Sequence, residues 1–309
     1  MSTPLRPMST GEILDRTFNL YRNNFLLFAG IAVVPPALML VVQLIQAGMV
    51  ATPGHPRAAG AGLLVAGSLG MIVGVVAYVI GQAVAHAATI FAVSAVHLER
   101  TTSIGESYGR VKGRYGRVVW VIIQIGLRAF WPAAVLFMIA AIAAGVMGAS
   151  KSSAASLVFG LAFFVAAVAF VVGIVLYLRY ALAVAACVLE DIKASAAIRR
   201  SVFLTAGCRG QIFVIYFLMG IIASIVSWVF TIPALFFAAA VAKGSPAVAT
   251  LFTGVAGFLA GTLAGPIATI ALSLVYFDQR VRKEAFDLQL MMAAVDGTPL
   301  PGAQAASVG

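Results

Sequence analysis

The chain has 309 residues, of which 62% are hydrophobic and 10% are charged, whereas soluble domains carry about 25% charged residues. An apolar excess of this size cannot be buried in a water-soluble core. The composition therefore excludes an ordinary soluble domain and predicts an all-α integral membrane protein. The net charge of +10 does not indicate nucleic-acid binding, because the basic residues are distributed over several separate loops.

Six apolar runs are long enough for membrane-spanning helices, each of which needs about 20 residues. Short loops rich in Gly, Pro, Ser and Lys join them in pairs, which predicts three transmembrane hairpins. A short charged segment precedes each pair. We therefore expect one membrane domain, residues 1–295, of three tandem units, each an interfacial amphipathic helix followed by a transmembrane hairpin. The runs are 25–46, 61–96, 118–147, 156–187, 211–242 and 248–277, and the units are about 9–99, 103–191 and 195–290.

The first unit opens with "STGE", in which Ser9 and Glu12 have the spacing of a capping box at the start of a helix. In the residues that follow, apolar side chains share one helical face and charged side chains share the other. This pattern is typical of a helix lying at a membrane surface, with its apolar face toward the lipid. The second apolar run contains Gly70 and Gly74, a GxxxG pair that predicts close contact between helix backbones.

The second unit repeats the opening of the first. Five residues of the opening segment recur 94 positions later, including Ser103 and Glu106 of "SIGE". The third unit repeats it less closely: Ile198, Gly207 and Gly210 correspond to residues 94 positions earlier, but the Glu of the capping box is missing.

Two further patterns accompany the three units. The first run of every unit contains a Pro-Ala pair, which supports the repeat independently. The last run of the third unit contains a double GxxxG motif, which favours the second and sixth runs as the crowded centre of the bundle. Its glycines are Gly257, Gly261 and Gly265. After this run, the segment 296–309 is predicted to be a disordered tail.

Lys and Arg gather on one side of the predicted topology. They precede the odd-numbered runs and follow the last one, whereas the alternate loops hold only Arg57, Lys151 and Lys243. This asymmetry is the positive-inside signal, and it predicts an inner-membrane protein with both termini in the cytoplasm. We expect basic contacts with anionic lipid headgroups on that side, although the charge could serve topology alone. The candidate contacts are Arg16, Arg22, Arg110, Lys112, Arg114, Arg117, Arg199 and Arg200.

Arg128 and Arg179 lie inside the two runs of the middle hairpin, about ten residues from the cytoplasmic ends. Charged residues within membrane helices are costly and often functional. Because the runs contain no Asp or Glu, the two guanidinium groups form a candidate site for an anionic headgroup or substrate. The alternative is that both side chains reach the interface, or pair there with Glu99 or Glu190.

Other polar residues in the runs are interpreted mainly as contacts between helices. Gln82 and His86 lie one turn apart, and they predict hydrogen bonds between helices, with a proton relay as the alternative for His86. Gln43, Gln46 and Gln124 are interpreted in the same way. No nucleophile–base set, phosphate-binding loop or metal-ligand spacing is present. The sequence therefore predicts a protein without enzymatic activity, metal or cofactor.

The stretches "GEILDRTFNLYRNNF" and "YFDQRVRKEAFDLQLM" resemble the membrane-domain family attached to some bacterial glycerophosphoryl diester phosphodiesterases. That family also includes stand-alone multi-pass proteins. In fused members of that family, catalysis belongs to a separate TIM-barrel domain. The resemblance covers only the membrane part, and nothing in this sequence matches the barrel. The resemblance therefore does not imply phosphodiesterase activity for this chain.

Three functional hypotheses follow from the sequence. The first is a non-catalytic membrane protein that organises lipid or docks a partner through its basic helices. The second is a permease or lipid-handling transporter with an anion-binding site in the middle hairpin. The third is an intramembrane enzyme, which lacks a recognisable catalytic set. Membrane lipids are the expected partners, and the sequence leaves a protein partner or a homo-oligomer open.

Overall fold

The computed structural model describes residues 8–51, 60–98, 100–147, 153–241 and 246–284. Within these ranges every regular element is an α-helix, which confirms the predicted all-α class. The predicted tail 296–309 lies outside the described residues. The helices are α1 (Thr10–Asn23), α2 (Phe25–Ala32), α3 (Val34–Ala51), α4 (Gly60–His97), α5 (Ile104–Val111), α6 (Tyr115–Met147), α7 (Ser153–Tyr180), α8 (Ala183–Leu189), α9 (Ala194–Thr205), α10 (Arg209–Val241) and α11 (Pro246–Glu284).

Five helical segments in the described ranges are long and apolar enough to cross a membrane, and the bent pair α2–α3 makes a sixth. The chain is therefore a multi-pass membrane protein. The first run was predicted as one helix, but it bends by 41° at Val33. Pro35 and Pro36 explain the bend, since proline donates no backbone hydrogen bond and disfavours helical geometry in the preceding residue.

The fourth run is also interrupted. Helix α7 ends at Tyr180, and α8 begins at Ala183, so the predicted run 156–187 is broken at Ala181 and Leu182. Neither proline nor glycine marks this break in the sequence. Its cause is tertiary, because two hydroxyl groups of α9 bind the backbone on either side of it, as described below.

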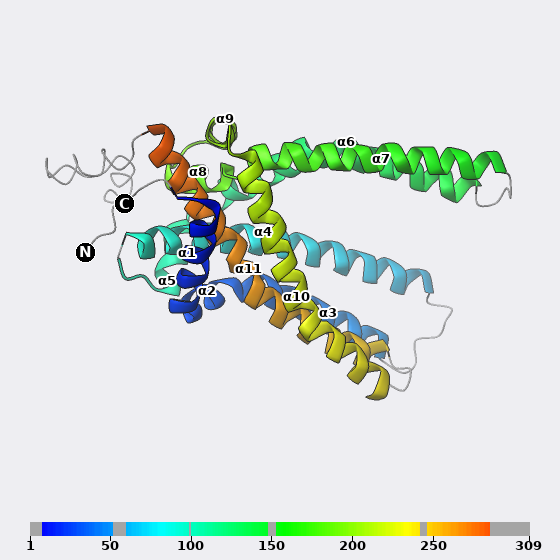
Figure 1. The fold of residues 1–309 in the computed structure, drawn as a ribbon. Coiled ribbons are helices and arrows are strands. Elements are labelled where there is room, and N and C mark those ends of the chain that lie inside the picture. The colour runs from blue at the N-terminus through cyan, green and yellow to red at the C-terminus, as the bar shows by residue number, and fades with distance from the viewer. Residues whose placement is uncertain (1–7, 52–59, 99, 148–152, 242–245, 285–309) are drawn as a thin grey trace, which may run out of the picture.

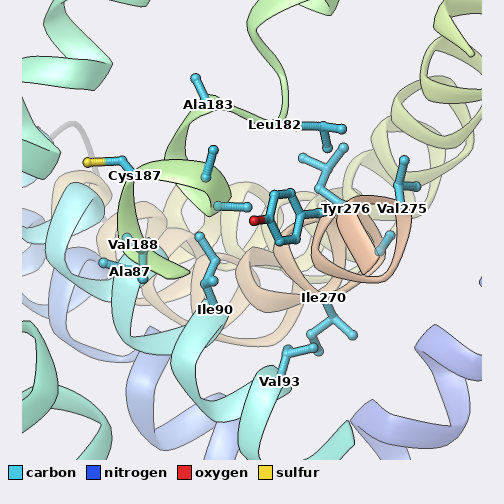
Figure 2. Packing of buried hydrophobic residues seen from close by; sticks show 14 of the residues in the cluster. Ala87, Ile90, Val93, Leu182, Ala183, Cys187, Val188, Ile270, Val275 and Tyr276 are labelled. Atoms are coloured by element: carbon cyan, nitrogen blue, oxygen red, sulfur yellow. The ribbon is translucent and has the colours of Figure 1, made fainter. Parts of the chain in front are cut away.

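The buried core lies at one end of the molecule. This end, which we call the basic end, carries α1, α5, α8 and α9 and both ends of the described chain (Figure 1). Figure 2 shows side chains of α4, α8 and α11 meeting there, including Ile90, Val188 and Tyr276. The opposite halves of the membrane helices expose mostly large apolar side chains, as expected for surfaces that face lipid.

Beyond the basic end the membrane helices form two separate bodies. Helices α3, α4, α10 and α11 pack together, and we call them the four-helix group. Helices α6 and α7 pack mainly on each other and leave the group as a projecting pair, which we call the hairpin (Figure 1). Helix α11 is the most buried span, whereas α7 is among the least buried.

The short amphipathic helices form where they were predicted, but other helices cover much of their apolar faces. In α1, Ile13 is fully buried and the Tyr21 hydroxyl donates to the carbonyl of Leu263 in α11 at 2.7 Å. In α5, the Tyr108 hydroxyl donates to the carbonyl of Ile31 at 2.6 Å. The expectation of apolar faces resting on lipid is therefore corrected for these residues.

The predicted caps are present in part. Ser9 and Glu12 form a complete capping box, whereas Ser103 accepts from the backbone N–H of Glu106, whose carboxylate accepts from Thr102 and Arg110. Gly113 and Gly207, 94 positions apart, both have positive φ, +84° and +88°, and each joins a short helix to a membrane helix. Only glycine adopts this left-handed geometry without strain.

Candidate functional site

A cavity of about 350 Å³ lies where the hairpin meets α4, α8, α10 and α11. Its volume is within the range of about 300–1,000 Å³ that is typical of small-molecule sites. Apolar side chains form most of its wall, together with Gly126 of α6. Polar side chains project from four helices, α4, α7, α10 and α11, and they are Gln82, His86, Tyr177, Tyr180, Tyr216, Thr269 and Ser273.

One side of the cavity is built by α4 and α11. The Thr269 hydroxyl lies 3.0 Å from Nε2 of His86 and 3.5 Å from Nδ1. One hydroxyl serves only the nearer nitrogen well, so the second ring nitrogen retains hydrogen-bonding capacity. Ser273 donates its proton to the carbonyl of Thr269 at 2.7 Å, which leaves its oxygen as an acceptor.

The opposite side is built by α7 and α10. The Tyr216 hydroxyl donates to the Tyr177 hydroxyl at 3.4 Å, and the two ring centroids are 5.6 Å apart. Phe130 of α6 packs on Tyr177 with centroids 6.0 Å apart. These ring contacts hold Tyr177 in place, while its own hydroxyl proton remains to be donated.

The break between α7 and α8 forms part of the wall, because Tyr180 and Ala181 line the cavity. Ser201 of α9 bridges the break. Its oxygen accepts from the backbone N–H of Leu182 at 3.2 Å, and its proton goes to the carbonyl of Arg179 at 2.9 Å. Thr205 donates to the same carbonyl at 3.2 Å. Helix α9 thus satisfies backbone groups that the interruption would otherwise leave unpaired in a buried place.

The structure does not bring Arg128 and Arg179 together in this cavity. Arg128 is exposed on α6 and makes no hydrogen bond or ion pair with any described residue. Arg179 lies directly before the helix break, and its buried Nε has no hydrogen-bond partner in the described part of the chain. Since Ala129 lies against Gly173 across the hairpin, Arg179 is about 7.5 Å nearer the basic end than Arg128 along the helix axis. An anion site at this pair remains a prediction.

The basic residues proposed for headgroup contact divide into two sets. Arg110 pairs with Glu106 at 2.7 Å, Arg114 and Arg117 both pair with Asp191, and Arg200 pairs with Glu190. These four are at least partly engaged within the chain. Arg16 is half-buried, and three others are exposed, namely Arg22, Lys112 and Arg199.

An ion-pair network at the basic end was not anticipated from the sequence. Arg200 of α9 binds Glu190 at 2.9 Å and also contacts Glu284 of α11. Tyr276 donates to Glu190 at 2.6 Å. Burial alone would lower the pKa of Arg200, but hydrogen bonds to Glu284 and Glu190 outweigh it and raise that pKa. The network joins α8, α9 and α11, and the sequence signal for it was only a carboxylate pair at 190–191.

The glycines predicted for helix packing face α3 in several places. A Cβ added at Gly74 would lie 2.6 Å from Val42, and one at Gly261 would lie 2.9 Å from Pro36, so α3 approaches both backbones closely. Gly70 and Gly265 have looser neighbours, both at 3.9 Å from the added Cβ. Gly257 instead lines a second cavity, of about 240 Å³, between α3, α4 and α11.

No group of three or more His, Cys, Asp or Glu side chains within the described ranges is placed to hold a metal ion. Cys187 and Cys208 are both buried and free, and burial raises the pKa of Cys208. The predicted lack of metal, cofactor and enzymatic activity stays a prediction.

The sequence matches no family model and no curated protein, and the fold matches no solved structure.

Proposed function

We propose that this chain binds an amphiphilic lipid in the cavity between the hairpin and the four-helix group and handles that lipid without chemical conversion. The supporting observation is the position of the polar side chains. They occupy the junction of two helix bodies whose remaining surfaces are apolar and exposed, so a polar head could occupy the cavity while its chains stay in hydrocarbon. Polar residues at such depth are costly unless they find partners.

This proposal favours lipid handling over docking of a soluble partner. Several of the arginines predicted for an outward-facing basic surface are engaged in ion pairs with the chain's own carboxylates. We further propose that Arg22, Lys112 and Arg199, which are exposed, contact anionic headgroups at the basic end. That end would then face the cytoplasm, in an inner membrane, as the charge asymmetry indicates.

The repeat and the resemblance enter the proposal as supporting expectations. Three tandem units would explain why Gly113 and Gly207 share one conformation 94 residues apart. Membership of the phosphodiesterase-associated membrane family would agree with a lipid ligand.

The test is to fill the cavity without disturbing the helices. Gly126 lines the cavity, and a Cβ added there meets no atom within 4 Å. Gly220 of α10 is equally open but does not line the cavity, so it provides a matched control. Native mass spectrometry of the detergent-purified protein should detect a retained lipid in the wild type and in Gly220→Phe, and at least about fivefold less in Gly126→Phe.

Both variants should elute as the wild type in gel filtration, which checks folding. Equal retention of the same lipid in Gly126→Phe and in the wild type would show that the lipid binds elsewhere. The proposal would then be wrong.

A further inference from the structure

We infer that the cavity selects an uncharged lipid alcohol rather than an anionic lipid. This inference rests on the proposed function, and it names the class of ligand for the same cavity. It departs from the sequence-based hypothesis of an anionic ligand at Arg128 and Arg179, because neither residue lines the cavity.

The cavity lining is electrically neutral. The described residues that line the cavity include no Asp, Glu, Lys or Arg. A phosphate or carboxylate moved into a membrane-embedded cavity without a cation would lose its hydration without an opposite charge to compensate. An uncharged head carries no such penalty.

Two helix ends lie at the cavity wall. Helix α7 ends at Tyr180 and α8 begins at Ala183, so a C-terminal end and an N-terminal end meet at the same place. Their partial charges have opposite sign and offset each other. The backbone therefore supplies no net field that would attract an anion in place of a basic side chain.

The cavity offers both hydrogen-bond donors and hydrogen-bond acceptors to a ligand. Tyr177 has a proton to donate, because its oxygen already accepts from Tyr216. Ser273 offers an acceptor oxygen, since its proton is given to the carbonyl of Thr269. The second nitrogen of His86 can serve in either role. A hydroxyl group, which both donates and accepts, matches this set, whereas a doubly ionised phosphate would only accept.

The test compares two lipids that differ in one phosphate. Diacylglycerol and phosphatidic acid with identical acyl chains are added in equal amounts to the full-length protein in detergent, and bound lipid is counted by native mass spectrometry. We expect diacylglycerol to bind in preference to phosphatidic acid. Gly126→Phe should abolish that binding, which assigns it to the cavity.

Two further variants test the chemistry. Tyr177→Phe should reduce diacylglycerol binding about fivefold, the factor for one neutral hydrogen bond, whereas Tyr115→Phe at the exposed start of α6 should not change it. Gln82→Arg adds a cation to the lining and should shift the preference toward phosphatidic acid.

The outcomes separate the two proposals. If phosphatidic acid binds as well as diacylglycerol in the wild type, and Gly126→Phe removes both, the ligand class is wrong while the proposed function stands. If Gly126→Phe leaves both lipids bound as in the wild type, the proposed function itself fails.

Discussion

The helix pairs α6–α7 and α10–α11 begin alike but pack against different neighbours. Each follows a glycine of positive φ, Gly113 or Gly207, and each has a proline inside its first helix, Pro132 or Pro233. However, α11 packs against α3 and α4, whereas α7 packs mainly on α6 beyond the basic end. Similar local sequence thus gives similar helix starts, and the neighbours decide which pair joins a bundle and which projects into lipid.

The comparison is sharpened most by changing one arginine that contacts α11 from α9 and one arginine on the hairpin. Arg200→Ala would leave Glu190 and Glu284 close together without their shared cation, so we expect a loss of about 2–3 kcal/mol in the free energy of unfolding. Arg128→Ala on the hairpin removes an exposed side chain, and its effect should stay within about 0.5 kcal/mol. Thermal unfolding in detergent, followed by intrinsic fluorescence, measures both. Equal effects would contradict the distinction between the two regions.

The hairpin should be most sensitive where its two helices touch. A Cβ at Gly173 would lie 2.6 Å from the backbone oxygen of Ala129, which cannot move aside as a side chain could. We expect Gly173→Ala to destabilise the protein by about 2 kcal/mol. Gly160 lies on the same helix with open space around it, so Gly160→Ala should be neutral or slightly stabilising. Disulfide trapping between cysteines placed on α6 and α7 measures the separation of the two helices. Cross-linking should slow in Gly173→Ala and stay unchanged in Gly160→Ala.

The break between α7 and α8 gives a smaller expected effect. Ser201→Ala removes the partner of the buried Leu182 N–H, which should cost about 1–2 kcal/mol. Ser195→Ala changes an exposed serine on the same helix and should have no measurable effect. Hydrogen exchange should accelerate at residues 181–184 in the first variant. Unchanged exchange there would mean that α9 does not hold the break in place.

The smallest effect concerns α5 and pH. A hydrogen bond from Arg110 lowers the pKa of Glu106 below its ordinary value. A carboxylate with a lowered folded-state pKa stabilises the fold above its unfolded pKa, and this contribution is lost as pH falls through the folded value. Hydrogen exchange in α5 should therefore increase below about pH 4, and Glu106→Gln should remove the pH dependence. Because Glu106 is exposed, an effect as large as that of Ser201→Ala would contradict this assignment.

The sequence predicted the membrane class and the helical runs because hydrophobic length is a local property. The capping serines Ser9 and Ser103 were also predictable, since a cap depends on residues three positions apart. The break at Ala181 was not, because hydroxyl groups of α9 set it from about 20 residues away along the chain.

The cavity was predictable only in part. His86 stood out as a polar residue inside an apolar run, and its contact with Thr269 fits the expected hydrogen bond between helices. Tyr177, Tyr216 and Ser273 gave no signal, because tyrosine and serine are ordinary residues in membrane helices. Only the convergence of α7, α10 and α11 brings their hydroxyl groups together.

The hydrogen bonds that α11 makes to Met8 and to Glu190 set an order for assembly during synthesis. The Met8 N–H donates to Asp278 at 2.6 Å, Arg282 returns a bond to the Met8 carbonyl at 2.7 Å, and Tyr276 holds Glu190. Helix α11 is translated last among the described helices, yet it supplies all three anchors. The earlier helices can enter the bilayer one pair at a time, but the packed interior closes only when the ribosome has delivered α11.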